Sequence, residues 1–191
     1  MRGRARFGVG DCTTVEPLQI SVPGLLLRPW RAQDAPEVMA AMREPAIARW
    51  NAAPSAAAGL EGAREWVRRR ADWSGGDHAS FAMAEPSTGE LLGSVSLHRI
   101  FDGAGSIGYW TLAPVRGRGL AALAVATVTG WAFQRLSLHR IELCHAVANA
   151  SSCRVAQKAG YLLEGTLRES YRYGDQQRHD EHIHGRLATD A

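Results

Sequence analysis

The sequence has few cysteines, almost no lysine and no long apolar run. The three cysteines, Cys12, Cys144 and Cys153, contain no Cys-x-x-Cys pair, so neither a disulfide framework nor a zinc site is predicted, and a reducing compartment fits. No stretch approaches the roughly 18 consecutive apolar residues typical of a membrane-spanning helix. Residues 1–10 carry arginines without a following apolar run, which argues against a secretory signal. We therefore expect a cytoplasmic protein that makes no membrane contact.

The chain has a small excess of positive charge, and its basic residues are not clustered in the sequence. Lys158 is the only lysine among 22 basic residues, and the net charge is +3. These residues are scattered among 19 acidic ones instead of forming a stripe, so nucleic acid is not an expected partner. The surplus is better suited to a small anionic ligand such as a phosphate-rich cofactor. A chain of 191 residues with 46% hydrophobic residues is predicted to form one globular domain.

The periodicity of apolar residues predicts an α/β (α+β) fold with a mixed, mostly antiparallel central sheet flanked by helices. Residues 1–24 show no period and are interpreted as a loose N-terminal extension, which leaves 25–188 as the domain. The predicted helices are 34–43, with Asp34 as the cap, 55–73, 120–136 and 151–159. The predicted strands are a short one from Leu25 ending at Pro29, then 78–84, 91–101, 106–112, 140–147, 161–173 and 178–187.

A glycine-rich turn before the long helix is the segment most indicative of chemistry. Gly117 and Gly119 lack the Cβ atoms that would hold the backbone away from a phosphate, and Arg116 and Arg118 add positive charge. The first turn of the helix offers free N–H groups and a positive dipole end. A purely structural turn is the alternative. Ala122 stands where a Gly-x-Gly-x-x-Gly motif needs its third glycine, and no Gly-Lys-Ser/Thr follows, so neither dinucleotide nor Walker A motif is complete.

Residues 116–121, Arg-Gly-Arg-Gly-Leu-Ala, resemble the Gln/Arg-x-x-Gly-x-Gly/Ala signature of the GNAT superfamily of N-acetyltransferases. Residues 27–30, 149–152, 155–161 and 164–168 are similar to the RimJ/RimL group of that superfamily. The resemblance covers 25–187 and implies a GNAT fold that binds acetyl-coenzyme A (acetyl-CoA). The residues that it implies for cofactor binding are Leu112, Ala113, Arg116, Gly117, Arg118, Gly119, Leu120, Ala121, Asn149 and Ser152.

The resemblance also implies catalytic roles. The backbone N–H near Leu112 would stabilise the oxyanion, and Asn149 would bind the pantetheine arm, although capping of the next helix is an equal alternative. Ser152 matches the serine proposed as general acid in RimL-like enzymes, with a simple first-turn serine as the alternative. Many other GNAT enzymes carry a tyrosine where this chain has Ala156, which favours Ser152 as the acid.

The general base remains open between three candidates. By register, the glutamate base of RimL-like enzymes corresponds to Tyr171 in this chain. Glu169 lies two residues away and would share its strand face, although an exposed carboxylate is the simpler interpretation. His98 and a water molecule are the other candidates.

The histidines near the C-terminus do not predict a metal site. On a strand, His182 and His184 share one face and His179 takes the other, and no helical i, i+4 pair exists. We expect surface histidines and no metal. Trp30, Trp50 and Tyr109 are expected in the core or in the wall of a pocket.

The predicted function is acetyl-CoA-dependent transfer of an acetyl group to a primary amine, directly and without an acyl-enzyme cysteine. The favoured acceptor is a protein N-terminal α-amine of the ribosomal-protein type. One alternative is a small-molecule amine (antibiotic, polyamine or amino acid), which a closed, acid-lined cavity would favour over an open groove. A non-catalytic acyl-CoA-sensing or nucleic-acid-binding module is the other. Relatives in this group are often dimers, so the resemblance allows a homodimer.

Overall fold

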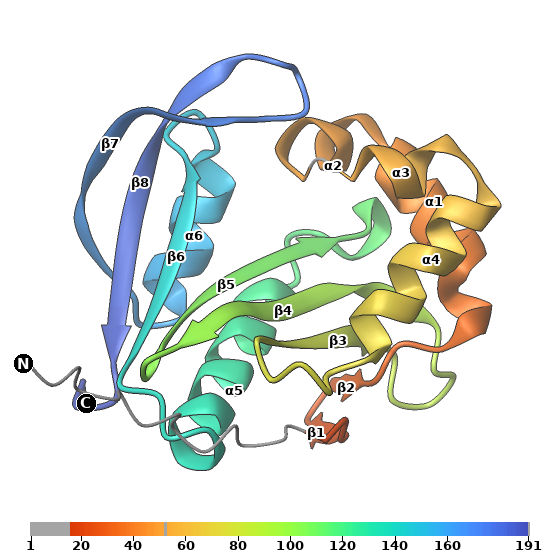
Figure 1. The fold of residues 1–191 in the computed structure, drawn as a ribbon, viewed down its shortest axis with the longest axis horizontal. Coiled ribbons are helices and arrows are strands. Elements are labelled where there is room, and N and C mark those ends of the chain that lie inside the picture. Colours follow the sequence, from red (N-terminus) through yellow and green to blue (C-terminus); the bar gives the residue numbers. More distant parts are fainter. Residues whose placement is uncertain (1–15, 52, 191) are drawn as a thin grey trace, which may run out of the picture.

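The computed structural model describes residues 16–51 and 53–190 and has one eight-stranded sheet (Figure 1). The strand order is β1-β2-β3-β4-β5-β6-β8-β7, and every neighbouring pair is antiparallel except β5 and β6, which are parallel. The strands are β1 (Ile20–Val22), β2 (Leu25–Arg28), β3 (His78–Ala84), β4 (Leu91–Phe101), β5 (Ala104–Thr111), β6 (Arg140–Ala146), β7 (Leu162–Arg172) and β8 (Arg178–Leu187). This architecture confirms the predicted fold class.

Helices cover both faces of the sheet. They are α1 (Ala35–Arg43), α2 (Pro45–Trp50), α3 (Pro54–Ala58), α4 (Leu60–Ala71), α5 (Leu120–Arg135) and α6 (Ala150–Lys158), with short 3-10 helices η1 (Ala32–Asp34) and η2 (Ala113–Val115). Helices α1 to α4 gather beside β3 and β4, whereas α5 crosses the other face (Figure 1). In the described part of the chain, none of these helices combines the length and apolar character needed to span a membrane.

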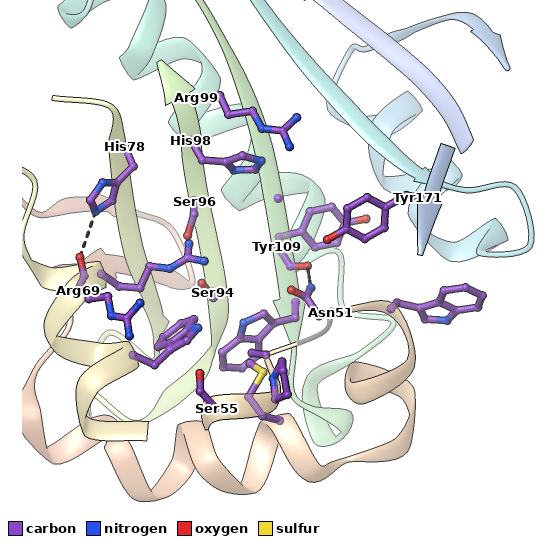
Figure 2. A pocket seen from close by; sticks show the side chains of 18 of the residues that line it. Asn51, Ser55, Arg69, His78, Ser94, Ser96, His98, Arg99, Tyr109 and Tyr171 are labelled. Atoms are coloured by element: carbon purple, nitrogen blue, oxygen red, sulfur yellow. Dashed lines mark hydrogen bonds between the residues drawn. The ribbon is translucent and has the colours of Figure 1, made fainter. Parts of the chain in front are cut away.

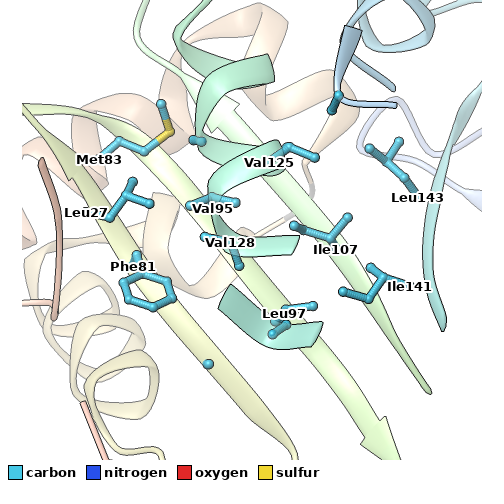
Figure 3. Packing of buried hydrophobic residues seen from close by; sticks show 14 of the residues in the cluster. Leu27, Phe81, Met83, Val95, Leu97, Ile107, Val125, Val128, Ile141 and Leu143 are labelled. Carbon is cyan, nitrogen blue, oxygen red and sulfur yellow. The ribbon is translucent and has the colours of Figure 1, made fainter. Parts of the chain in front are cut away.

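Two hydrophobic clusters fill the space between the helices and the sheet. Phe81 and Met83 of β3 pack in the larger cluster, with Val125 and Val128 of α5 (Figure 3). Ala82, which points to the opposite face of the same strand, packs in the smaller cluster formed by α1 to α4. The alternation along β3 therefore places α5 and the N-terminal helices on opposite sides of the sheet.

The helical region between the first strands and β3 differs from the prediction. The helix predicted over 55–73 is interrupted at Gly59, which separates α3 from α4, and α2 was not predicted at all. Pro45 opens α2 and Glu44 caps it by accepting a hydrogen bond from the Ala46 amide, so this helix depends on its first turn instead of an apolar period. Six residues are too few to show a helical repeat.

Two further predictions near the N-terminus are wrong in part. Residues Ile20–Val22, assigned to the loose extension, form β1 and pair with β2 across a turn in which Gly24 has φ of 77°. Asp34 occupies the N-cap position of α1, as predicted, but its side chain makes no cap hydrogen bond, because its buried carboxylate pairs with Arg28 at 2.7 Å. Residues 1–15 of the predicted extension lie outside the described residues.

Candidate active site

The site lies where β5 and β6 separate. The two strands pair only over Ala104–Ser106 and Arg140–Glu142, after which β5 continues to Thr111 and β6 to Ala146 without further pairing between them. A groove of about 780 Å³ occupies the gap, lined by both strands, the turn before α5, and α6. This volume lies within the range of cofactor and ligand sites, roughly 300–1,000 Å³.

The free edge of β5 faces this groove. The Leu112 amide donates to the Leu92 carbonyl of β4 at 2.9 Å, so even-numbered residues here direct their backbone groups toward β4. The carbonyl of Tyr109 instead accepts from Asn51 Nδ2 at 3.0 Å, on the other side. Alternation therefore directs the amides of Tyr109 and Thr111 toward the groove, where an extended ligand could pair with the strand. The prediction that the Leu112 amide faces the reaction is wrong, because that amide is used within the sheet.

The glycine turn combines a special backbone conformation with open space. Gly117 and Gly119 have φ of 79° and 81°, in the left-handed region, and a Cβ built on either meets no atom within 4 Å. The conformation, and not crowding by the chain itself, is therefore what requires glycine. Gly119 directly precedes α5 as its N-cap residue, and no cap hydrogen bond from a side chain is present there among the described residues. The first amides of α5 are available to an anion, so the turn fits the diphosphate of a coenzyme.

The positive charge around the turn is distributed differently from the prediction. Arg116 is paired with Glu44 and also donates to the Thr111 carbonyl, so it fastens the turn to α2. Arg118 is exposed and does not line the groove. Arg154 and Lys158 of α6 line it instead. Their i, i+4 spacing placed them on one helix face, which was the available sequence signal.

Most of the predicted cofactor residues come together. The groove is lined by Arg116, Gly117, Gly119, Leu120, Ala121, Asn149 and Ser152. Three of the predicted residues, Leu112, Ala113 and Arg118, do not line it.

A hydroxyl pair lies at the inner end of the groove. The Ser152 hydroxyl is 2.7 Å from the Tyr109 hydroxyl, and the Asn149 side chain caps α6 by accepting from the Ser152 amide at 3.2 Å. Burial raises the pKa of Tyr109 to about 12, so its phenol stays protonated at neutral pH. Ala156 is fully buried and contributes no polar group. Sequence reasoning placed Tyr109 only as core or pocket wall and missed this contact across 43 residues.

A second cavity of about 700 Å³ meets the groove at this point. His98, Arg99, Tyr109 and Tyr171 line both spaces, and Figure 2 shows them around the second one. The turn between β7 and β8 reaches across to α2 (Figure 1), where the Gly174 amide donates to the Arg49 carbonyl at 2.9 Å. A Cβ on Gly174 would lie 1.7 Å from a backbone oxygen of α2, so this close approach requires glycine.

The second cavity is basic. Arg69, Arg70 and Arg99 line it, against Asp77 as the acidic residue. Arg69 is paired with Glu65, whereas Arg70 and Arg99 have no ion-pair partner within 16–51 and 53–190. This cavity therefore favours an anionic group.

The two side chains predicted as candidates for the general base lie in different environments. His98 lines both cavities, and its pKa is lowered, first by burial and then by Arg70 and Arg99, so it is neutral and able to accept a proton. Glu169 is exposed and lines neither cavity. The pairing of β7 and β8 shifts between Leu167 and Tyr171, and Glu169 has φ of 44°, so the expectation that Glu169 and Tyr171 share a regular strand face is wrong.

The expectation of surface histidines on β8 is also wrong for His184, which is fully buried. His182 and His184 lie beside His145 of β6 and Cys153 of α6. His145 was not singled out from the sequence.

The sheet divides between β5 and β6, next to the glycine turn at the start of α5. A fold of this kind can hold an extended ligand that carries phosphate groups between the two strands. Residues 24–162 match the family described as the acetyltransferase (GNAT) domain, and the chain belongs to this family. The family resemblance read from the sequence is therefore confirmed. Acetyltransferases of this family use acetyl-CoA, and matching structures contain acetyl-CoA or CoA.

Two Bacillus subtilis (strain 168) proteins are similar in sequence. YdaF, which carries the name of a ribosomal N-acetyltransferase, is 32% identical over 55% of this chain and 56% of its own length. YjcK, which carries the name of an N-acetyltransferase, is 39% identical over 47% of this chain and 51% of its own length. The chain thus spans about half the length of these curated relatives.

Solved structures share the fold over nearly the whole chain. RimJ of Mycobacterium smegmatis, in complex with CoA-disulfide, has a TM-score of 0.80 at 22% identity and covers 93% of this chain and 89% of its own. The ribosomal-protein-S5-alanine acetyltransferase of Vibrio fischeri has a TM-score of 0.79 at 19% identity and covers 91% of this chain and 98% of its own. At these identities the likeness shows the fold.

Proposed function

We propose that this protein is an acetyl-CoA-dependent N-acetyltransferase that acetylates the N-terminal α-amine of a protein, with negative charge near the start of that acceptor chain. The observation that carries the proposal is the meeting of two spaces at Tyr109 and Ser152, one suited to the coenzyme and the other open and basic. The names of YdaF and of the ribosomal-protein acetyltransferases among its structural relatives support a protein acceptor.

The groove residues would hold the coenzyme by main-chain contacts. The first amides of α5, at Leu120 and Ala121, would bind the diphosphate, and Arg154 and Lys158 would add positive charge. The free edge of β5 would pair with the pantetheine arm. When bound, the coenzyme supplies an acetyl group as a reactive thioester.

The hydroxyl pair would act as the general acid. Tyr109 would donate a hydrogen bond to Ser152 Oγ, which leaves the Ser152 O–H free to point at the departing sulfur. As the sulfur takes the Ser152 proton, the Tyr109 proton would move to Ser152, and solvent would return a proton to Tyr109, which equals the one that the acceptor amine loses. The amide of Tyr109 or Thr111 would donate to the oxygen on which negative charge develops, in place of Leu112.

His98 would remove the proton from the acceptor. An ammonium group must lose a proton before it can attack, and His98 is the neutral base that lines both spaces.

The charge of the second cavity supports an anionic acceptor over a polycationic one. Polyamines and aminoglycoside-like antibiotics are cations, which Arg70 and Arg99 would repel. A peptide with an acidic residue after its free N-terminus places a carboxylate near these arginines and an amine near His98.

A screen of acceptors tests the proposal through the release of the coenzyme thiol. The panel contains two peptides of otherwise identical sequence, one with aspartate and one with lysine at the second and third positions. It also contains the aspartate peptide with a blocked N-terminus, spermidine, and free amino acids. The expected result is turnover of the aspartate peptide at least about tenfold faster than of the lysine peptide, and none with the blocked peptide. Preference for spermidine or a free amino acid would contradict the protein acceptor, and coenzyme binding without any turnover would contradict the enzyme.

A further inference from the structure

Four side chains with metal-binding chemistry lie together beside the groove, which His145 also lines. We name them the His-Cys cluster: His145 of β6, His182 and His184 of β8, and Cys153 of α6. One ligand atom from each lies within 4.8 Å of all the others. His145 and His182 are direct partners in the β6–β8 register, and His184 lies two residues further along the same strand face. Helix α6 lies beside these strands and contributes the thiol (Figure 1).

The distances fit a tetrahedral metal site. His145 Nε2 is 3.2 Å from His184 Nε2, and Cys153 Sγ is 4.0 Å from the same nitrogen. Zinc bonds of about 2.0–2.1 Å to nitrogen and about 2.3 Å to sulfur place tetrahedral ligands roughly 3.4 Å apart for two nitrogens and roughly 3.6 Å apart for nitrogen and sulfur. Small adjustments of the Cys153 side chain would complete this geometry.

The hydrogen bonding of His145 directs a lone pair into the cluster. His145 Nδ1 is 2.8 Å from the Ala146 carbonyl oxygen, which can only accept, so the proton is on Nδ1 and the lone pair on Nε2. A backbone carbonyl that fixes the tautomer of an imidazole in this way is the usual outer partner of a metal-binding histidine.

The protein's own hydrogen bonds do not complete the cluster. Within the described residues, Nδ1 of His182 is buried without a hydrogen-bond partner, and Nε2 of His184 faces the lone-pair nitrogen of His145 and the sulfur of Cys153. His184 is fully buried, and buried polar groups in proteins are nearly always paired.

We propose that the His-Cys cluster binds one Zn²⁺ ion through His145, Cys153, His182 and His184. Imidazole and thiolate are the ligands that zinc prefers, and four protein ligands make a closed site with no position for a substrate. The ion would therefore be structural. It would fasten the first turn of α6 to β6 and β8, and Ser152, next to Cys153, would be held in place by the same turn. The site does not depend on the proposed acetyl transfer.

Cobalt(II) titration of the chelator-treated full-length protein, without coenzyme, tests the site. We expect one equivalent of Co²⁺ to give the visible bands of a tetrahedral ion and a near-ultraviolet thiolate-to-cobalt band, all displaced by Zn²⁺. Cys153→Ser, which preserves side-chain size, should lose the thiolate band, and His184→Ala should weaken binding at least about tenfold. Cys144→Ser and Cys12→Ser are the matched thiol controls and should retain the band.

Thermal unfolding provides a second readout. Zn²⁺ should raise the Tm of the parent protein and of Cys144→Ser, and should leave Cys153→Ser unchanged, because only a ligand that binds the folded state stabilises it. The absence of saturable one-to-one binding, or a thiolate band that persists in Cys153→Ser, would overturn the proposal. In that case His145 and His184 would be a hydrogen-bonded pair of neutral imidazoles.

Discussion

The two spaces that meet at Tyr109 are built in different ways. The groove offers mainly backbone groups: the edge of β5, the turn at Gly117 and Gly119, and the first amides of α5. The second cavity offers side chains, including Arg70 of α4 and His98 and Arg99 of β4. Backbone groups suit a ligand that is the same for every member of a family, whereas side chains can change without altering the fold. The acceptor preference should therefore reside in the second cavity.

The largest effect is expected for a change in the groove, which is built mainly from backbone groups. Gly119→Val should weaken acetyl-CoA binding by at least about a hundredfold, because valine is strained at φ of 81° and its branched side chain would enter the groove. Isothermal calorimetry measures this directly. Gly130→Val is the matched control, since Gly130 lies within α5, away from its first turn, with open space at its Cβ. Equal affinities in the two variants would remove the turn from the coenzyme site.

Substitutions where the groove and the second cavity meet should have the next largest effect. Ser152→Ala and Tyr109→Phe should each lower kcat about a hundredfold while the Kd for acetyl-CoA changes little, since each breaks the same proton relay.

Because the two hydroxyls act as a unit, the double variant should be hardly slower than either single one. Tyr161→Phe is the control, because Tyr161 makes a similar hydroxyl contact of 2.6 Å with Thr129 in the core. Additive losses in the double variant would show that the hydroxyls act separately.

Substitutions in the second cavity should change the preference among acceptors and not the affinity for the coenzyme. Arg70→Ala should lower kcat/KM for the aspartate peptide about tenfold and leave a neutral peptide nearly unchanged, because one charge-assisted contact is lost. Arg64→Ala, on the exposed face of the same helix, is the matched control. A uniform loss for all peptides would assign Arg70 to folding instead of recognition.

The smallest effect concerns pH. The pKa of His98 lies below its ordinary value of about 6.5, since burial, Arg70, Arg99 and His78 all disfavour its charged form. The kcat profile should therefore rise with pH through an apparent pKa below 6.5, where His98 loses its proton, and should be flat above it. His98→Gln should lose this rise. A parent profile that still rises above pH 7 would assign the limiting proton to another group.

The contrast between local backbone elements and contacts of distant side chains also explains which features could be predicted from the sequence. The turn, α5 and the strands around them are local, so the glycines and apolar periods predicted these elements, and the family resemblance assigned ten cofactor residues, of which seven line the groove. The contact between Tyr109 and Ser152 joins residues 43 positions apart, and the pairing of Arg116 with Glu44 joins residues 72 apart. No periodicity encodes such contacts.

Local irregularities account for the remaining errors. The pairing of β7 with β8 shifts register around Glu169, so Glu169 does not share a strand face with Tyr171 as it would in a regular strand. His145 gave no signal because its partners come from β8 and α6, which only the folded sheet brings beside it.

A crystal structure of the protein with CoA tests the central claim most directly. We predict that the diphosphate accepts hydrogen bonds from the amides of Leu120 and Ala121 and that the pantetheine arm runs along β5 toward Ser152. A diphosphate bound away from the first turn of α5, or an arm that does not pass between β5 and β6, would contradict the account.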